Sequence, residues 1–245
     1  MIEITSVFQY SHPGKVREKN EDAIHADPEH AFWILADGVG GHVGGEIASQ
    51  LVISSISETL PEHVLNESIE KACNDIARAQ TEHAHYANMG TTLVIAQKQK
   101  RAFNIAWVGD SRLYCYDESL RLLTHDHSFV QELIDRGVLT KPQARRHGKR
   151  NLITNFIGLQ GERATVAYKQ FKPVKSGTLL LCSDGVTDYV TEGQLAIIMA
   201  STTDNEARAE QLVSCVFDTP AADNLSFIFV SYNVSLGLKL LNRVT

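Results

Sequence analysis

Six short clusters of acidic or glycine residues follow one another along this chain, most of them where an apolar strand is expected to end. They lie at residues 17–22, 37–41, 90–92, 109–112, 183–185 and 223–224. Carboxylates that are gathered in one place repel each other and lose hydration, so they need a cation to neutralise them. Hard oxygen ligands of this kind suit Mg²⁺ or Mn²⁺. The pattern therefore predicts a metal-dependent enzyme that acts on phosphate.

The composition is that of an ordinary globular chain. Its 245 residues are 43% hydrophobic and 21% charged, and its formal net charge is −6. This acidity argues against a nucleic-acid partner, because nucleic-acid binders are normally basic. It does not argue against phosphate chemistry, since bound metal ions invert the local charge of a site.

The chain carries no signal of secretion or membrane insertion. No apolar segment approaches the ~18 residues that a membrane span needs, and the first residues have no basic region followed by a long apolar stretch. The cysteines are widely separated and form no CxxC pair, which predicts reduced thiols. Together these features predict a cytoplasmic protein without membrane contact. These cysteines are Cys73, Cys115, Cys182 and Cys215.

The order of the expected elements favours stacked antiparallel sheets with helices outside them. Strands are expected at residues 31–36, 91–96, 102–108, 113–116, 178–182 and 225–232, with 102–108 and 113–116 forming a hairpin. Helices are expected at residues 45–59, from a cap at Asn66 through His83, at 129–136 after Ser128, and at 206–217. Helices thus fall between groups of strands rather than after every strand. No linker or repeat interrupts the chain, so we expect a single domain.

Three aspartates are the strongest candidates for the metal site. Asp37, Asp184 and Asp223 each come at the edge of an apolar run and are followed by Gly or Asn. A side chain at a strand end points beyond the sheet, and a glycine lets the backbone approach a ligand closely. A single Asp-Gly after a strand is usually only a turn. The ordered set is more specific than any of its members.

Eight motifs in order resemble the metal-dependent protein phosphatases (PPM family, type 2C serine/threonine phosphatases) in their short bacterial stand-alone form. The resemblance spans roughly residues 5 to 232. The motifs are RxxNED at 17–22, DGxGGHxxGExAS at 37–49, GTT at 90–92, GDSRxY at 109–114, DHSxVxxL at 126–133, the stretch 140–158 with Ala144, His147, Arg150 and Asn151, CSDGxxD at 182–188, and DNxS at 223–226.

The resemblance implies an α+β fold, an αββα sandwich of two packed antiparallel sheets flanked by helices. It implies a phosphatase domain at residues 1–234, with a flap at about 129–165 and a tail at 235–245. It also implies two Mn²⁺ or Mg²⁺ ions and possibly a third. Asp37 would bridge the two ions. Glu21 and the Gly38 carbonyl would complete one site, and Asp184 and Asp223 would hold the other. Asp22 would orient metal-bound water, and Asp110 with Asp184 would offer a weaker third site.

The implied chemistry is hydrolysis of phosphoserine and phosphothreonine in proteins. Two ions ~3.5–4 Å apart lower the pKa of a bridging water towards ~7, and the resulting hydroxide attacks phosphorus without a covalent intermediate. Arg17 would bind the phosphate, because a guanidinium fork matches phosphate oxygens bidentately. The catalytic residues would be Arg17, Asp37 and Asp184. The substrates would be phosphoproteins of a serine/threonine kinase in the same cell.

One position departs from several eukaryotic relatives. They carry a histidine directly after the metal-binding Asp-Gly, assigned as the general acid, and here that residue is Val39. The proton would then come from metal-bound water, or the leaving alkoxide is protonated later. His42 is either a substitute acid or a structural residue.

Several alternatives stay open at this level. A phosphoprotein-binding pseudophosphatase keeps the fold without turnover, and a small-metabolite phosphatase shares all the metal chemistry. His125 and His127 resemble a zinc-binding HxH pair, although the family pattern makes His127 a packing or hydrogen-bonding residue at the flap base. The basic residues of the flap either attract acidic phosphopeptides or form a solvated loop. The tail at 235–245 either packs on the domain or docks to a partner.

Overall fold

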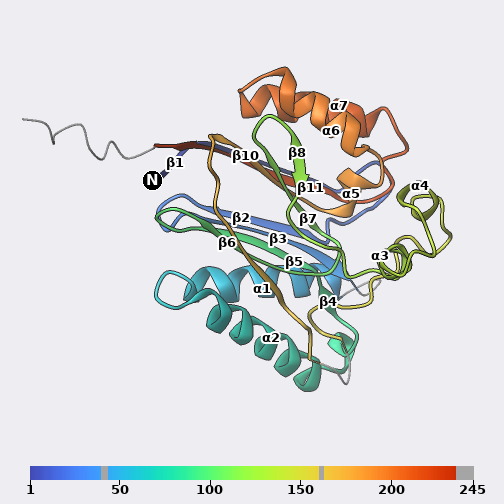
Figure 1. Ribbon diagram of the computed structural model, residues 1–245. Coiled ribbons are helices and arrows are strands. Elements are labelled where there is room, and N and C mark those ends of the chain that lie inside the picture. The colour runs from blue at the N-terminus through green and yellow to red at the C-terminus, as the bar shows by residue number, and fades with distance from the viewer. Residues whose placement is uncertain (40–43, 160–162, 236–245) are drawn as a thin grey trace, which may run out of the picture.

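Two antiparallel β-sheets stack face to face, and helices cover both outer sides (Figure 1). The computed structural model describes residues 1–39, 44–159 and 163–235. The αββα sandwich expected from the sequence is confirmed.

The first sheet has the strand order β1-β11-β10-β7-β8, and the second has the order β2-β3-β5-β6-β9, with β4 paired to β3. The first sheet consists of β1 (Ile2–His12), β11 (Leu225–Val234), β10 (Gly177–Cys182), β7 (Arg112–Tyr116) and β8 (Leu120–Leu122). The second consists of β2 (Asp22–Asp27), β3 (Phe32–Val39), β5 (Leu93–Lys98), β6 (Phe103–Val108) and β9 (Ala167–Phe171), with the short β4 (Gly90–Thr91).

Helices α1 (Gly45–Thr59) and α2 (Leu65–Glu82) cover the outer face of the second sheet, and α6 (Glu192–Ser201) and α7 (Asn205–Phe217) cover that of the first (Figure 1). The segment predicted to be a flap, residues 129–165 (the flap segment below), carries α3 (Phe129–Asp135) and α4 (Lys141–Ala144) beside one end of the sandwich. Two one-turn elements, η1 (Ala84–Tyr86) and α5 (Asp184–Thr187), complete the described part of the chain. No helix in that part is both long and apolar enough to cross a bilayer.

The central strands are buried on both faces, which is why they read as continuous apolar runs. Trp33 and Leu35 of β3 point into the core between the two sheets, whereas Phe32 and Ile34 pack against α1 and α2. This alternation follows from the two-residue period of a strand. Three apolar layers result, one between the sheets and one under each pair of helices.

The predicted hairpin of residues 102–108 and 113–116 is wrong. Strand β6 belongs to the second sheet and β7 to the first, where β7 pairs with β10 and β8. The turn at Gly109 (φ +97°) carries the chain from one sheet to the other. Both strands still contribute apolar side chains to the core between the sheets, so their sequence pattern is the same in either arrangement.

The helix predictions were mostly confirmed. Helix α1 has the expected bounds, and the Ser128 hydroxyl caps α3 by accepting a hydrogen bond from the Gln131 amide at 3.4 Å. The cap predicted at Asn66 is wrong, because α2 already begins at Leu65 after Val64. The half-exposed edge strand β1 and helix α6 were not predicted.

A buried carboxylate fastens α2 to α1. The Asp75 carboxylate accepts hydrogen bonds from the Ser55 hydroxyl (2.7 Å), the Lys71 ammonium (2.7 Å) and the Arg78 guanidinium (2.8 Å). Burial opposes ionisation of Asp75, but the hydrogen bonds from Lys71 and Ser55 outweigh it, and its pKa is lowered. The ionised form therefore stabilises the folded state.

We expect Asp75→Asn to lower the free energy of unfolding by about 1–3 kcal/mol at neutral pH, because it weakens charged hydrogen bonds at a buried site. Since the pKa is lowered on folding, this stabilisation is complete above the unfolded value of about 3.9 and is lost as the pH falls towards the folded value. Urea denaturation of both proteins at several pH values measures it. The exposed Glu67→Gln in the same helix is the control. If the difference in free energy of unfolding between wild type and Asp75→Asn does not narrow in acid, the stabilising role of ionised Asp75 is contradicted.

Candidate metal centre

Acidic side chains from distant parts of the chain meet at one end of the two sheets. Asp22 opens β2 and is the register partner of Asp37 in β3. Asp110 lies in the turn between β6 and β7, Asp184 is the first residue of α5, and Asp223 lies two residues before β11. Asp37 is inside its strand rather than beyond its end, because pairing with β4 extends β3 to Val39. The residues predicted as a metal site therefore lie together.

These carboxylates destabilise one another's charged forms. Burial raises the pKa of Asp37 well above its ordinary value, and the charges of Asp22, Asp184 and Asp110 raise it further. Burial likewise raises the pKa of Asp184, followed by the charges of Asp110 and Asp223. Because neighbouring carboxylates raise the pKa of both Asp37 and Asp184, a bound cation would stabilise their charged forms.

The donor set fits a hard divalent cation. One carboxylate oxygen each of Asp22 and Asp110 (Oδ1) is buried and lacks a hydrogen-bond partner among the described residues. Buried carboxylate oxygens without partners are costly, and oxygen ligands suit Mn²⁺ and Mg²⁺. Within the described ranges, however, no three His, Cys, Asp or Glu side chains form a ready-made ion site. The carboxylates are close electrostatic neighbours rather than a preassembled coordination shell.

A serine pair joins the two sheets beneath the centre. The Ser183 hydroxyl donates to the Asp22 carboxylate at 2.9 Å and accepts from the Ser226 amide at 3.1 Å. The Ser226 carbonyl in turn accepts from the Ser183 amide at 3.0 Å. Asp22 begins a strand of the second sheet, whereas Ser183 and Ser226 lie in or beside strands of the first. This contact therefore fixes the two sheets relative to each other at the site.

The start of α1 closes over Glu21 and Gly38. The Gly38 amide donates to the Glu21 carbonyl at 3.1 Å, and the Ser49 hydroxyl of α1 donates to the same carbonyl at 2.6 Å. A Cβ on Gly45 would lie 2.9 Å from the Glu21 carboxyl carbon and 3.0 Å from the Gly38 carbonyl carbon. Only glycine at position 45 allows the helix to approach both groups this closely.

Arg17 lies over the centre on an exposed loop. Its guanidinium contacts the Asp223 carboxylate at 3.1 Å, and its side chain is 53% exposed. The charge of Asp223 raises the pKa of Arg17. The loop thus places a solvent-facing guanidinium beside a carboxylate of the candidate site.

One amide side chain holds both ends of this loop. Asn224 donates from Nδ2 to the carbonyls of Pro13 (3.0 Å) and Lys19 (2.9 Å), and its Oδ1 accepts from the Glu21 amide at 2.8 Å. Sequence reasoning assigned no role to Asn224, Ser183 or Ser226. Their positions next to Asp223, Asp184 and Leu225 were the available signal.

The two histidines that flank Asp126 have different hydrogen-bond partners. His125 contacts Asp135 (2.8 Å), whereas His127 Nδ1 accepts from the Gly109 amide (3.1 Å) and lies 2.9 Å from Asn155 Nδ2. The two rings thus have different partners, which supports the expected hydrogen-bonding role of His127 at the flap base and not a zinc pair. His42, together with Gly40 and Gly41, lies outside the described residues.

With this fold and site in place, comparisons with known proteins identify the family. Residues 11–219 match the family model of Protein phosphatase 2C, and the chain belongs to that family. The serine/threonine phosphatase Stp of Listeria innocua is 30% identical over 237 residues, which cover 90% of this chain and 93% of that protein.

Solved structures agree with this assignment. The crystal structure of the Mycobacterium tuberculosis serine/threonine phosphatase PstP/Ppp matches with a TM-score of 0.84 and 27% identity, covering 94% of this chain and 99% of that one. A structure of the PstP catalytic domain in complex with 2 manganese ions matches with a TM-score of 0.83 and 26% identity, covering 96% and 100%.

Replacing Asn224 with alanine is expected to release the loop that carries Arg17 and Glu21. Three main-chain groups lose a buried partner, so we expect the free energy of unfolding to fall by about 2–3 kcal/mol. The Glu21 amide should also exchange its hydrogen faster. Hydrogen exchange by mass spectrometry measures this, with the exposed Asn233→Ala in β11 as the control. Unchanged exchange in residues 13–21 would show that Asn224 does not hold the loop.

Proposed function

We propose that this chain is a metal-dependent serine/threonine protein phosphatase that hydrolyses phosphoserine and phosphothreonine in proteins. The observation that carries the proposal is the cluster of buried, mutually repelling carboxylates at the end of a Protein phosphatase 2C fold. Residues 1–234 form the phosphatase domain, residues 129–165 its flap, and the tail at 235–245 lies almost wholly outside the described residues.

We assign the ligands of two Mn²⁺ or Mg²⁺ ions to the residues around this cluster. Asp37 would contribute to both ions, and its closeness to Asp22, Asp184 and Asp223 supports that central place. Glu21 and the Gly38 carbonyl, which α1 covers, would hold one ion, and Asp184 and Asp223 would hold the other. Asp22 would orient a water molecule from its serine-anchored position, and Asp110 with Asp184 would offer the weaker third site.

The protein's own residues bind and orient the substrate. When bound, the two ions would supply Lewis acidity and a water whose pKa lies near neutrality. Arg17 reaches solvent from its loop, so it can exchange Asp223 for the phosphoryl oxygens of a substrate, which a guanidinium binds bidentately. Val39 cannot donate a proton, and its backbone pairs with Gly90 at the end of β3. The proposed proton donor for the leaving serine or threonine oxygen is metal-bound water, with later protonation of the alkoxide, or His42, as the alternatives.

The partners follow from this activity. The substrates are phosphorylated proteins, and we expect a serine/threonine kinase in the same cell to supply them. Four cysteines without disulfides support a reducing compartment, and we propose the cytoplasm.

Phosphate release from a phosphothreonine peptide tests the function directly. We expect release with Mn²⁺ and none with EDTA. Asp37→Asn should reduce kcat by at least about 10³-fold, because one residue contributes to both ion sites. It should also leave the metal-free protein as stable as the wild type or more stable, because it removes a repelled charge. Thermal unfolding with and without Mn²⁺ measures this second effect.

The exposed Asp218→Asn is the matched control. Release by wild-type protein that continues in EDTA would contradict the metal-dependent mechanism. Near-normal turnover by Asp37→Asn would contradict the ligand assignment. No release with Mn²⁺ demonstrably bound would favour the phosphoprotein-binding alternative.

Arg17→Ala is expected to raise KM for the phosphopeptide about tenfold or more, because a charged hydrogen-bonding partner of the phosphate is lost. Arg17→Lys should recover part of the loss, since lysine keeps the charge but not the fork. Steady-state kinetics and inhibition by inorganic phosphate measure both. Arg101→Ala, an exposed arginine in the β5–β6 turn, is the control, and equal KM values for all four proteins would exclude Arg17 from phosphate binding.

A further inference from the structure

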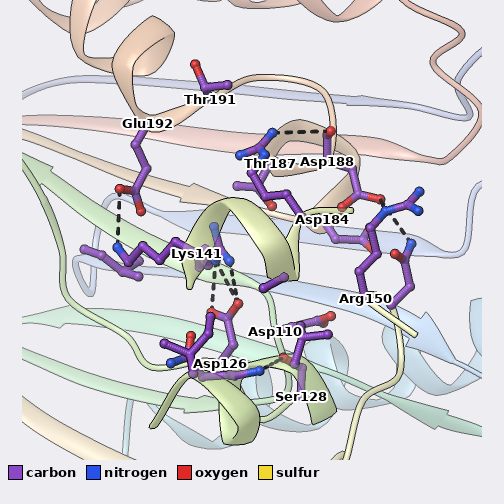
Figure 2. A pocket seen from close by; sticks show the side chains of 18 of the residues that line it. Asp110, Asp126, Ser128, Lys141, Arg150, Asp184, Thr187, Asp188, Thr191 and Glu192 are labelled. Carbon is purple, nitrogen blue, oxygen red and sulfur yellow. Dashed lines mark hydrogen bonds and ion pairs between the residues drawn. The ribbon is translucent and has the colours of Figure 1, made fainter. Parts of the chain in front are cut away.

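A cavity of about 390 Å³ lies between the flap segment and the core, directly beside the candidate metal centre (Figure 2). Asp110 and Asp184 form part of its wall. The rest of the lining comes from β7 and β8, from the segment 126–128, from the flap segment between Val130 and Asn151, from α5 with Asp188, and from residues 191–193 at the start of α6. The cavity thus opens onto the place where the phosphate of a substrate is proposed to bind.

Most of the exposed surface of this cavity is apolar, although many of its lining residues carry charge. Leu122 comes from the core, and the flap adds Val130, Ile134, Pro142 and Ala144. A volume of this size lies within the range of small-molecule sites and holds one aliphatic or aromatic side chain.

The charged groups of the wall largely neutralise one another. Arg112 contacts Asp126 at 2.6 Å, Lys141 contacts Glu192 at 3.5 Å, and Arg150 contacts Asp188 at 3.7 Å. Arg145 donates to the Asp188 carbonyl at 3.5 Å. Figure 2 shows the Lys141–Glu192 pair on one side of the cavity and the Arg150–Asp188 pair on the other.

Asp110 and Asp184 remain, and they face the proposed metal centre. Arg112, Lys141 and Arg150 already have carboxylate partners and Arg145 donates to the Asp188 carbonyl, so an acidic side chain in the cavity would have to displace one of these contacts. A basic side chain would lose hydration in an apolar lining whose acids outside the centre are paired. The wall therefore selects an uncharged side chain.

We propose that this cavity is a specificity pocket for an apolar side chain of the phosphoprotein substrate, close in sequence to the phosphorylated residue. The proposal rests on the proposed function, because the phosphate must bind at the carboxylates that form the inner wall. An extended peptide advances about 3.3 Å per residue, and residues two apart point to the same side. A leucine or phenylalanine one to three residues from the phosphothreonine can therefore enter the cavity while the phosphate stays at the centre.

Gly193 offers a way to fill the pocket without disturbing the centre. It lines the cavity near the start of α6, and a Cβ there would meet only the Thr191 hydroxyl at 3.9 Å. Gly193→Phe should therefore add an aromatic ring at the wall of the cavity without a clash at its Cβ and leave the fold intact. Gly148→Phe is the matched control, because Gly148 lies in the flap outside the lining, and a Cβ there meets nothing within 4 Å.

The experiment compares phosphothreonine peptides that differ only at positions −3 to +3, where Leu, Ala, Glu or Lys is placed in turn. We expect the wild type to show about tenfold higher kcat/KM for Leu than for Ala, Glu or Lys at one of these positions. Gly193→Phe should reduce that preference to within about twofold, whereas Gly148→Phe keeps it. Hydrolysis of para-nitrophenyl phosphate, which has no side chain to fill the pocket, should be the same in all three proteins.

Equal rates for the four residues at every position, or a preference for Glu, would overturn the pocket, as would an undiminished Leu preference in Gly193→Phe. Binding of the same peptides in the presence of Mn²⁺, measured by fluorescence anisotropy, distinguishes failure of the pocket from failure of the proposed function. Absence of turnover on every substrate would reject the proposed phosphatase activity. In that case peptide binding alone tests the pocket: Leu should strengthen binding about tenfold in the wild type and not in Gly193→Phe, and any other result would overturn the pocket.

Discussion

Mutual repulsion among buried carboxylates is the constraint around which this molecule is arranged. Asp22, Asp37, Asp110 and Asp184 lie where burial and neighbouring charge both oppose their ionised forms. Such a cluster persists only if the surrounding structure holds it in place. The hydrogen bonds of Ser183, Asn224 and the residues of β4 do so, and the energy of the apolar layers offsets the repulsion. A bound cation would relieve it, which couples stability to function.

The two sheets must be in register for the centre to exist at all. The second sheet supplies Asp22 and Asp37, whereas Asp184 and Asp223 flank strands of the first. The apolar core between the sheets fixes their separation, and the contact of Ser183 with Asp22 crosses it. A change in the packing of this core would therefore move one half of the carboxylate set against the other.

The sequence predicted the parts that depend on local pattern and missed those that depend on long-range contact. Buried strands and α1 have periodic or continuous apolar runs, and the ordered motifs indicated the family and the fold, both now confirmed. The sequence pattern could not show whether β6 and β7 belong to the same sheet. Both strands place apolar side chains in the core between the sheets, so their pattern would be the same in either arrangement. The motifs at 182–188 and 223–226 contain Ser183 and Asn224, but the roles of these residues rest on contacts with residues more than 150 positions away, which the motifs do not show. The ligand roles of the acidic residues stay predictions.

The short helix α5 connects the centre to the flap. Asp184 is its first residue and faces the carboxylate cluster, while Asp188 follows one turn later and donates its amide to the Asp184 carbonyl at 2.8 Å. The Asp188 carboxylate accepts from Asn151 at 3.1 Å and contacts Arg150. Because one turn of helix separates these two carboxylates, a shift of the flap segment would act on α5 through Asp188, close to Asp184. A substitution that alters the contact of the flap segment with Asp188 would therefore affect both the wall of the cavity and the candidate metal centre.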